Sequence, residues 1–265
     1  MTCLSRLQEE NNSSVSKSVN NLYINLFRIT IHNGCEDNTS AVNMFPLSPK
    51  FMPLDLSGRK LKFVDTDYLK DMTEQLIKHM EKFVSIAPEL QPAIDSYFKV
   101  LSCKKKAILL KEGDPCRLKY FVLKGCLRMY FITEKGVEHT MQFALENWWI
   151  SDYMAFSAQK ASKFYIQAVE ASEVLTIDFA NLEKLYLEVP VTERYFRLIY
   201  QKAAAASQQK TKFFQDLSKE ELYQQFNANF PEFMQRVPQY LVASYLGLTP
   251  EYVSEIRRKA FLKPV

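Results

Sequence analysis

The spacing of apolar residues changes several times along the chain, and each change predicts a different kind of structure. Near Met72, apolar residues begin to recur every three or four positions, at Leu76, Ile77, Met80 and Phe83, which is the period of an amphipathic helix. Residues 1–71 show no sustained helical or strand period. We therefore expect folded structure to begin near Met72, with 1–71 either a poorly ordered extension or sequence upstream of a true start at Met72.

Between about Leu101 and Phe179 the chain changes to short β-rich runs separated by turns. Three of the six glycines, Gly113, Gly125 and Gly136, fall in these turns, where a positive φ is needed. Closely spaced short strands are typical of an antiparallel barrel or jelly roll, a fold that can enclose a pocket. The predicted strands are 107–111, 118–124, 126–133, 137–145, 164–170 and 173–179.

A long helix is predicted from Pro190 to about Leu217, because proline suits the first turn of a helix. Along it a stripe of mostly apolar or small residues recurs with alternating spacings of three and four, as in a coiled-coil seam. We interpret this stripe as a surface on which two copies associate. The alternative is that it packs on the β-strands of its own chain. The seam residues are Phe196, Ile199, Ala203, Ala206, Lys210, Phe213 and Leu217.

The last part of the chain predicts a helix-turn-helix. Ser218 and Glu221 match a capping box that begins a new helix. Farther on, Gly247 permits a tight turn between two short helices, and Thr249 and Pro250 are a good cap and first residue for the second one. Small or apolar positions would form the core between these two helices: Val242, Ala243, Leu246, Leu248, Val253 and Ile256.

The second helix of this pair carries the candidate DNA-binding residues. Its polar positions lie between the buried ones and would face a major groove, and its basic side chains would reach phosphates. From Ile256 to Val265 the chain has four basic residues and no acidic residue. The alternative is a helical hairpin that docks on a protein partner. The candidate residues are Thr249, Glu251, Tyr252, Ser254, Glu255, Arg257, Arg258 and Lys259.

Composition argues against several other classes of protein. The longest stretch without a charge, Val237 to Pro250, is shorter than the about 20 apolar residues that span a membrane, and the first residues do not form a secretory signal. We expect a cytoplasmic protein with no membrane partner. Five scattered cysteines and three histidines predict neither disulfides nor a metal site. Because the common nucleophile and nucleotide motifs are also missing, we expect no enzymatic activity and no cofactor.

The combination of a β-roll, a long helix and a C-terminal helix-turn-helix resembles the Crp/Fnr family of bacterial transcription regulators. The resemblance covers about 190 residues, from Thr73 to Lys263. It is strongest in Lys111–Asp114, in Tyr120–Gly125, in the strand pair at 164–179 and in Gln239–Lys259. The segments Arg236–Leu241 and Tyr245–Glu251 are similar to the Bacteroidetes branch of that family.

This resemblance implies an α+β fold with three functional segments along the chain. Residues 72–189 would be a cyclic-nucleotide-binding-like sensor domain, an antiparallel β-roll of the jelly-roll type; 190–217 would be the dimerisation helix, and 218–265 an all-α helix-turn-helix domain. The family implies a homodimer that regulates transcription by reading two half-sites of double-stranded DNA. RNA polymerase and an unidentified small-molecule effector are the further implied partners. The alternative is a sensor module that acts through protein contact.

Two departures from the family pattern reduce the number of effectors to be expected. Cyclic-nucleotide binders hold ribose and phosphate with a Gly-Glu pair and an arginine, but the matching segments, Ile150–Phe156 and Ala161–Phe164, contain no glycine and no arginine. Cyclic AMP is therefore not the expected ligand. Cys3 and Cys35 do not supply the clustered thiolates of an iron–sulfur sensor. The expected pocket would take an uncharged or hydrophobic effector, or be a filled core with none; its lining would be Met141, Phe143, Tyr153, Phe156, Ser162, Lys163 and Tyr165.

Overall fold

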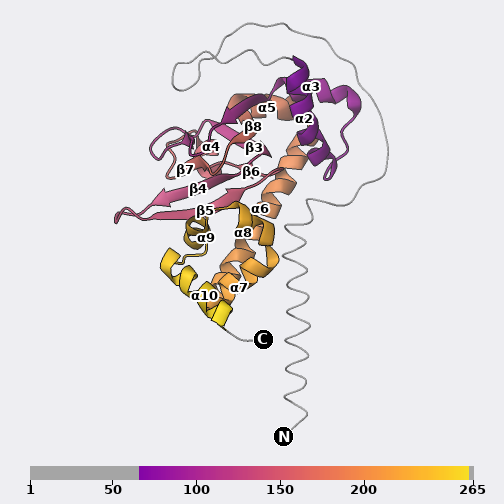
Figure 1. Ribbon diagram of the computed structural model, residues 1–265. Coiled ribbons are helices and arrows are strands. Elements are labelled where there is room, and N and C mark those ends of the chain that lie inside the picture. Colours follow the sequence, from indigo (N-terminus) through magenta and orange to yellow (C-terminus); the bar gives the residue numbers. More distant parts are fainter. Residues whose placement is uncertain (1–65, 263–265) are drawn as a thin grey trace, which may run out of the picture.

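Two four-stranded antiparallel sheets form the centre of the protein, in a computed structural model that describes the backbone of residues 66–262 and the side chains of 71–259 (Figure 1). The expectation for residues 1–65 lies outside this range. The strand orders are β1-β8-β3-β6 in the first sheet and β2-β7-β4-β5 in the second. The strands are β1 (Lys99–Cys103), β2 (Ile108–Leu110), β3 (Leu118–Lys124), β4 (Leu127–Ile132), β5 (Glu138–Ala144), β6 (Trp149–Ile150), β7 (Tyr165–Ala168) and β8 (Ser172–Asp178).

All six predicted strands are confirmed, with ends that differ by one or two residues. The sequence pattern missed β1 and β6. Strand β6 has only two residues, too few to show a period, and it forms because Tyr120 and Phe121 of β3 pair with Ile150 and Trp149. The fold class is confirmed as a β-roll followed by helices.

Helices cover the outer side of the first sheet (Figure 1). Helix α2 (Thr66–Glu81) packs against β1 and β3, and α5 (Phe179–Glu188) packs against β8. Helix α2 begins at Thr66, six residues before the predicted start at Met72. The predicted boundary at 71/72 therefore falls inside a helix. The remaining short helices are η1 (Pro88–Leu90), α3 (Gln91–Ser96) and α4 (Tyr153–Ala158).

The long helix is confirmed as α6 (Val191–Asp216), and it leads into a C-terminal helical unit. Ser218 and Glu221 form the predicted capping box: Ser218 N donates to the Glu221 carboxylate at 2.9 Å, and Glu221 N donates to Ser218 Oγ at 3.3 Å. This box begins the helical unit, which consists of α7 (Lys219–Asn229), α8 (Pro231–Arg236), α9 (Gln239–Tyr245) and α10 (Pro250–Leu262).

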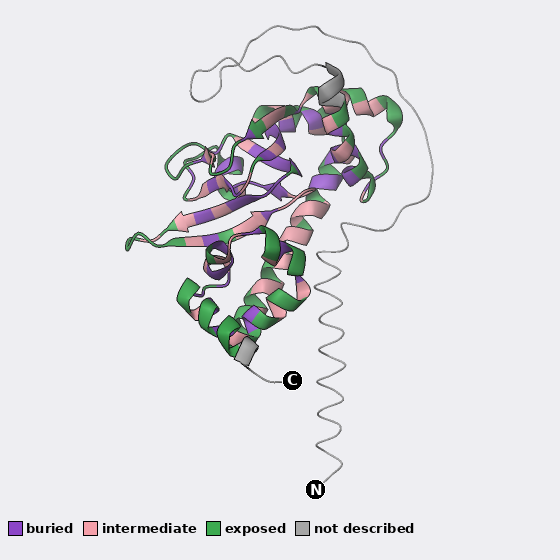
Figure 2. Ribbon diagram, viewed as in Figure 1, coloured by how far each residue is buried: buried purple, intermediate pink, exposed green. Residues whose placement is uncertain are grey.

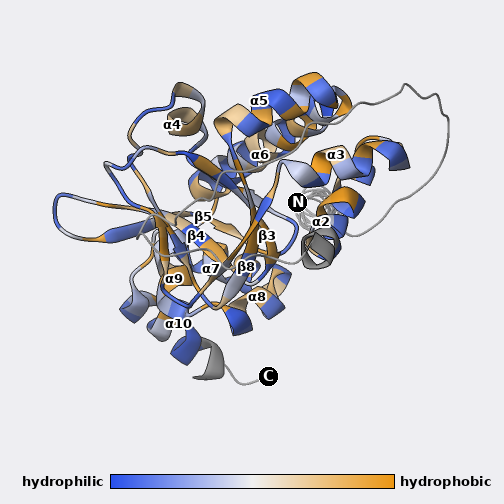
Figure 3. Cartoon of the chain, turned by 90° about the horizontal axis from the view of Figure 1, so that it is seen from above, coloured by the Kyte–Doolittle hydropathy of each residue, from blue (hydrophilic) through white to orange (hydrophobic). Residues whose placement is uncertain are grey.

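Buried apolar side chains form two clusters, and the second one holds the helical unit on the β-roll. The first cluster joins both sheets to α2, α5 and the first turns of α6. The second cluster combines the core of α7–α10 with Cys126 and Val169, which lie at the ends of β4 and β7. Burial is concentrated in the strands and the helix sides turned toward them, whereas α10 is mostly exposed (Figure 2). Seen from above, apolar residues follow β3 and β8 and polar residues follow the outer helix surfaces (Figure 3).

Candidate nucleic-acid interface

Helices α9 and α10 form the predicted helix-turn-helix around a small dry core. Gly247 adopts a φ of 66°, which glycine accepts without strain, and so the chain turns sharply between the helices. Ala243 is completely buried, as expected for a small residue where two helices cross. The core residues predicted from the sequence are all buried: Val242, Leu246, Leu248, Val253 and Ile256.

The first turn of α10 is capped as the sequence indicated. The Thr249 hydroxyl accepts a hydrogen bond from Tyr252 N at 3.2 Å, and Pro250 occupies the first helical position. Ser254 turns its hydroxyl back onto its own helix and donates to Pro250 O at 2.9 Å. The beginning of α10 is therefore a fixed structure and not a fraying end.

Most of the candidate DNA-binding side chains lie on the outer side of α10. Tyr252 is half-buried and packs against the core of the helical unit, so only part of it is accessible. Glu255 and Lys259 pair with each other at 2.8 Å, and Arg257 Nη1 donates to Gln239 Oε1 of α9 at 2.9 Å. The exposed candidates are Thr249, Glu251, Ser254, Glu255, Arg257, Arg258 and Lys259.

The predicted seam on α6 faces its own chain at both ends. Phe196 is 2% exposed and packs on Trp149 of β6, so it cannot contribute to a surface between two copies. Lys210 Nζ donates to Met141 O at 3.0 Å and lies 3.7 Å from the ring of Tyr245. Ile199 and Phe213 pack on the two apolar clusters, and Ala203 and Ala206 are half-buried. The structure therefore corrects the assignment of Phe196, because a periodic stripe does not specify which neighbour it meets.

The seven residues of the predicted effector pocket do not come together. Met141 and Lys163 are exposed, and Phe143 packs on Phe233 and Tyr245 of the helical unit. The hydroxyl of Ser162, which is buried, donates to Asp152 at 2.8 Å. Tyr165 stacks on Tyr130, Tyr153 contacts Tyr200 of α6, and Phe156 packs on Phe179 of α5. The single grouping was wrong because these residues belong to β5, α4, β7 and the segment before β7, and their side chains contact different neighbours.

A buried lysine that the sequence did not single out lies between α4 and α6. Lys119 is 4% exposed and is surrounded by four aromatic rings, those of Phe156 and Tyr200 at 4.6 Å, Phe196 at 5.6 Å and Tyr153 at 5.8 Å. It also donates a hydrogen bond to the Tyr200 hydroxyl. Burial lowers the pKa of the Lys119 ammonium to about 8. A lysine in a strand pattern gives no sequence signal for such a cage, because the rings come from two segments, α4 and α6, that are distant from Lys119 in the sequence.

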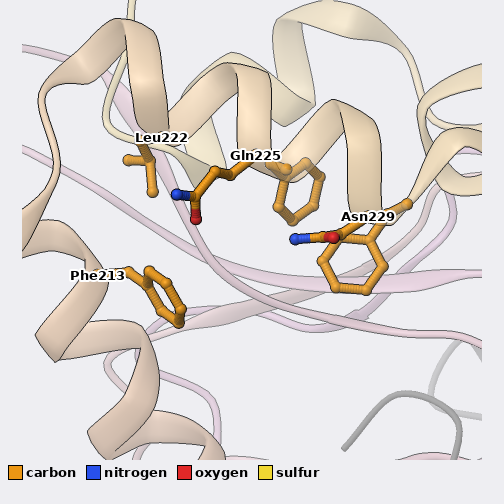
Figure 4. Close-up of a pocket in the computed structure, with 6 residues that line it drawn as sticks. Phe213, Leu222, Gln225 and Asn229 are labelled. Carbon is orange, nitrogen blue, oxygen red and sulfur yellow. The ribbon is translucent and has the colours of Figure 1, made fainter. Parts of the chain in front are cut away.

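A small open pocket lies between α6 and α7 (Figure 4). Phe213 faces Leu222 across it, and the amides of Gln225 and Asn229 lie on the α7 side. Phe226 and Phe230 complete its lining. None of these residues belongs to the predicted effector pocket.

Within residues 71–259, no three side chains of histidine, cysteine, aspartate or glutamate are grouped closely enough to hold a metal ion. His79 is buried in the core and shares a hydrogen bond of 2.8 Å with the Tyr195 hydroxyl. Cys103, Cys116 and Cys126 are buried free thiols, and burial raises the pKa of each. No helix among the described residues has the length and apolar character needed to cross a membrane.

Comparison with known proteins agrees with this architecture. The family model of the cyclic nucleotide-binding domain matches residues 100–188, from β1 to the end of α5. Over 166 residues the chain is 25% identical to the regulatory protein HlyX of Actinobacillus pleuropneumoniae, a match of 58% of this chain and 68% of that protein. Over 187 residues it is 25% identical to the electron transport regulator A of Shewanella oneidensis, covering 66% of this chain and 73% of that protein.

A third relative and one solved structure support the same grouping. The transcriptional activator protein anr of Pseudomonas aeruginosa is 24% identical over 166 residues, which are 58% of this chain and 66% of that protein. The structure of FixK2 from Bradyrhizobium japonicum matches with a TM-score of 0.51 at 18% identity, over 62% of this chain and 84% of that chain, and shows the shared fold. These relatives are named as regulators and not as enzymes. With its cyclic nucleotide-binding domain, long helix and C-terminal helix pair, the chain is similar to transcription regulators of the Crp/Fnr type.

Proposed function

We propose that this regulator binds double-stranded DNA as a homodimer and reads a two-fold symmetric site with α10. The observation that carries the proposal is the exposed outer side of α10, a capped helix held at a fixed angle by the core it shares with α9. Arg257, Arg258 and Lys259 give this helix a basic C-terminal half that suits phosphates. Glu251 and Ser254, one turn earlier, supply groups that can read base edges.

The homodimer is proposed on family grounds, with α6 as the dimerisation helix. In this arrangement the exposed side chains of α6 are different from the predicted seam and include Gln201, Ala204, Gln208 and Thr211. These residues follow a spacing of three and four, so they form one continuous stripe. The division into a sensor domain at 72–189, a dimerisation helix at 190–217 and a DNA-binding domain at 218–265 belongs to the same proposal, as does action in the cytoplasm.

We also propose that cyclic AMP is not the effector. Asp152 occupies the position where a nucleotide-binding relative would present its glutamate, and both of its carboxylate oxygens are already used. One accepts a hydrogen bond from Ala155 N at 3.1 Å, and the other accepts from Ser162 Oγ at 2.8 Å. Lys163, the one cation in the segment 161–164 that corresponds to the arginine of those relatives, is exposed. An effector of another kind and RNA polymerase stay predictions.

Selection of bound sequences from a random pool of DNA duplexes tests the proposal with the full chain, at a stated salt concentration. We expect a motif with two half-sites related by two-fold symmetry. Arg258→Ala should weaken binding to that motif, whereas Arg117→Ala, at an exposed arginine between β2 and β3, is the matched control. Failure to retain any duplex at low salt would contradict DNA binding and would favour docking on a protein partner.

A further inference from the structure

An arginine at the end of α8 clamps the helical unit onto two turns of the β-roll. Arg236 Nη1 and Nη2 donate to the Glu146 carboxylate at 2.9 and 2.6 Å. Its Nε donates to Glu170 at 2.8 Å, and Nη2 reaches the same oxygen at 2.5 Å. Glu146 lies between β5 and β6, and Glu170 lies between β7 and β8. One guanidinium therefore ties the entry to the helix-turn-helix to both turns.

The clamp is held in a fixed geometry on the side of the β-roll as well. Glu146 also accepts a hydrogen bond from Gly125 N at 2.8 Å, so its carboxylate is oriented before Arg236 binds. About two thirds of each of the three charged side chains is buried, with 34%, 33% and 32% exposed for Arg236, Glu146 and Glu170. A bidentate contact between a guanidinium and a fixed carboxylate restricts the relative orientation of the two groups as well as attracting them. A lysine in the same place would supply only the attraction.

Two residues then hold the helices along the free edge of the second sheet. Strand β5 is an edge strand, so one side of its backbone has no neighbouring strand. Ser244 of α9 accepts a hydrogen bond from Thr140 N at 2.9 Å and donates one to Glu138 O at 2.8 Å. Lys210 of α6 donates to a carbonyl farther along the strand, Met141 O, at 3.0 Å. Helix α9 is therefore hydrogen-bonded to the β-roll and not merely in apolar contact with it.

The clamp fixes α10 without covering it. Val242 and Ala243 of α9 are completely buried against the same core as Val253 of α10, so the two helices move together. The outer residues of α10, such as Ser254 and Arg258, are exposed while the clamp is closed. The contacts of Arg236 consequently set the angle of α10 and leave its outer face free.

We propose that Arg236 is a positioning residue for DNA recognition, which holds α10 at the angle needed to enter DNA without touching DNA itself. The proposal rests on the proposed function. If a side chain already holds the helical unit in place on the β-roll, the entropy cost of ordering them is not paid when DNA binds. Loss of the clamp should therefore weaken specific binding and leave the number of phosphate contacts unchanged.

The test compares Arg236→Gln with Arg236→Lys, with the double variant Glu146→Gln, Glu170→Gln, and with Arg117→Gln as a surface control on the β-roll. The probe is a duplex that carries the motif selected by the wild-type protein. We expect about tenfold weaker binding for Arg236→Gln, a size typical of coupling between distant sites. The Glu146→Gln, Glu170→Gln variant should lose the same amount of affinity for the duplex. Adding Arg236→Gln to it should weaken binding no further. Arg236→Lys should recover little, and the dependence of affinity on salt should keep its slope in every variant.

A second measurement needs no DNA. Hydrogen exchange at the amide of Thr140, which Ser244 protects, should become faster in Arg236→Gln than in wild type, while amides of β3 should exchange as before. Folding of each variant is checked by its thermal transition. Unchanged affinity and unchanged exchange at Thr140 would overturn the positioning role, and tighter binding would show that the clamp restrains recognition instead. If the wild type binds no duplex but Arg236→Gln still speeds hydrogen exchange at Thr140, the proposed DNA binding is refuted. The role of Arg236 in holding the helical unit on the β-roll would still be supported.

Discussion

The hydroxyl of Ser244 stands in for a neighbouring strand at the edge of β5: it accepts a hydrogen bond from Thr140 N at 2.9 Å and donates one to Glu138 O at 2.8 Å. An edge strand exposes backbone groups that must bind water or another partner. Thr140 is 3% exposed, so water cannot replace this contact where the helical unit covers the strand. One side chain of the helical unit thus completes the hydrogen bonding of this stretch of β5.

Replacing Ser244 by alanine should lower the free energy of unfolding by about 1 to 2 kcal/mol, because it leaves the buried N–H of Thr140 without an acceptor. Chemical denaturation monitored by circular dichroism would measure the loss. The matched control is Ser254→Ala on α10, whose hydroxyl is exposed and binds only Pro250 O of its own helix. That variant should change stability by less than about 0.5 kcal/mol. Equal effects of the two substitutions would refute a structural role for the Ser244 contact.

Lys119→Met should make the protein more stable at pH 7. Burial lowers the pKa of Lys119 to about 8 from its ordinary value near 10.5, so the folded state holds its proton less tightly than the unfolded state. The resulting penalty is at most about 3 kcal/mol, less what the surrounding rings return through cation–π attraction. A methionine of similar length removes the charge and keeps the packing.

The pH dependence separates this effect from ordinary repacking. Between pH 8 and 10.5 the unfolded wild-type chain binds the Lys119 proton and the folded chain does not, so wild-type stability should rise with pH. The advantage of Lys119→Met should therefore shrink through that window. Thermal unfolding of both proteins from pH 7 to 10.5 would measure it. A constant difference across the window would argue against a buried charge.

His79 should make the fold sensitive to acid. Burial lowers its pKa to about 3 from an ordinary value of 6.5, with smaller contributions from the charges of Lys82 and Lys202. As pH falls from 6.5 toward 3, only the unfolded state takes up the proton, and stability is lost. The loss by pH 4 is about 3 kcal/mol. His79→Phe should be less stable than wild type at pH 7, because the Tyr195 hydroxyl keeps its bond from Trp149 but loses the one to His79, and it should show a flatter stability curve in this window. Parallel curves for the two proteins would disprove the assignment.

Gly125→Ala should be strongly destabilising, and Gly136→Ala is its matched control. Both glycines have a positive φ, 101° and 76°. A Cβ at Gly125 would lie 2.3 Å from Ser172 Oγ and 2.7 Å from its Cα, whereas a Cβ at Gly136 would meet nothing within 4 Å. The control should cost about 1 kcal/mol from backbone strain, and Gly125→Ala about 3 kcal/mol or more from strain plus overlap. Denaturation midpoints would compare them, and similar losses would contradict the close approach.

Replacing Arg257, Arg258 and Lys259 together by alanine should reduce the salt dependence of DNA binding. Each lost phosphate contact lowers the slope of log affinity against log salt by about 0.9. We expect a total decrease of about 2 to 3, smaller if the Glu255 partner of Lys259 already keeps it from phosphate. Fluorescence anisotropy with a labelled duplex between 50 and 200 mM salt would measure the slope. A slope equal to that of wild type would place the DNA contact elsewhere.

The sequence alone determined the elements whose signals are local. The turn at Gly247, the cap at Thr249 and the capping box of Ser218 with Glu221 each involve residues within four positions of one another, and all three formed as predicted. Six of the eight strands also followed from turn residues and short apolar runs. Local backbone preferences and caps act on neighbouring residues in any tertiary setting, so a sequence pattern is enough to find them.

Only the tertiary structure decided which surfaces meet. Arg236 lies 90 residues from Glu146, and Ser244 lies 106 residues from Glu138, so no local pattern announces the clamp or the covered edge of β5. The stripe through Phe196 had the right period for a helix, but a period fixes only which residues share a face. What that face touches depends on how the apolar surfaces of sheets and helices pack against each other. Here the β-roll of the same chain packs on the part of the face around Phe196.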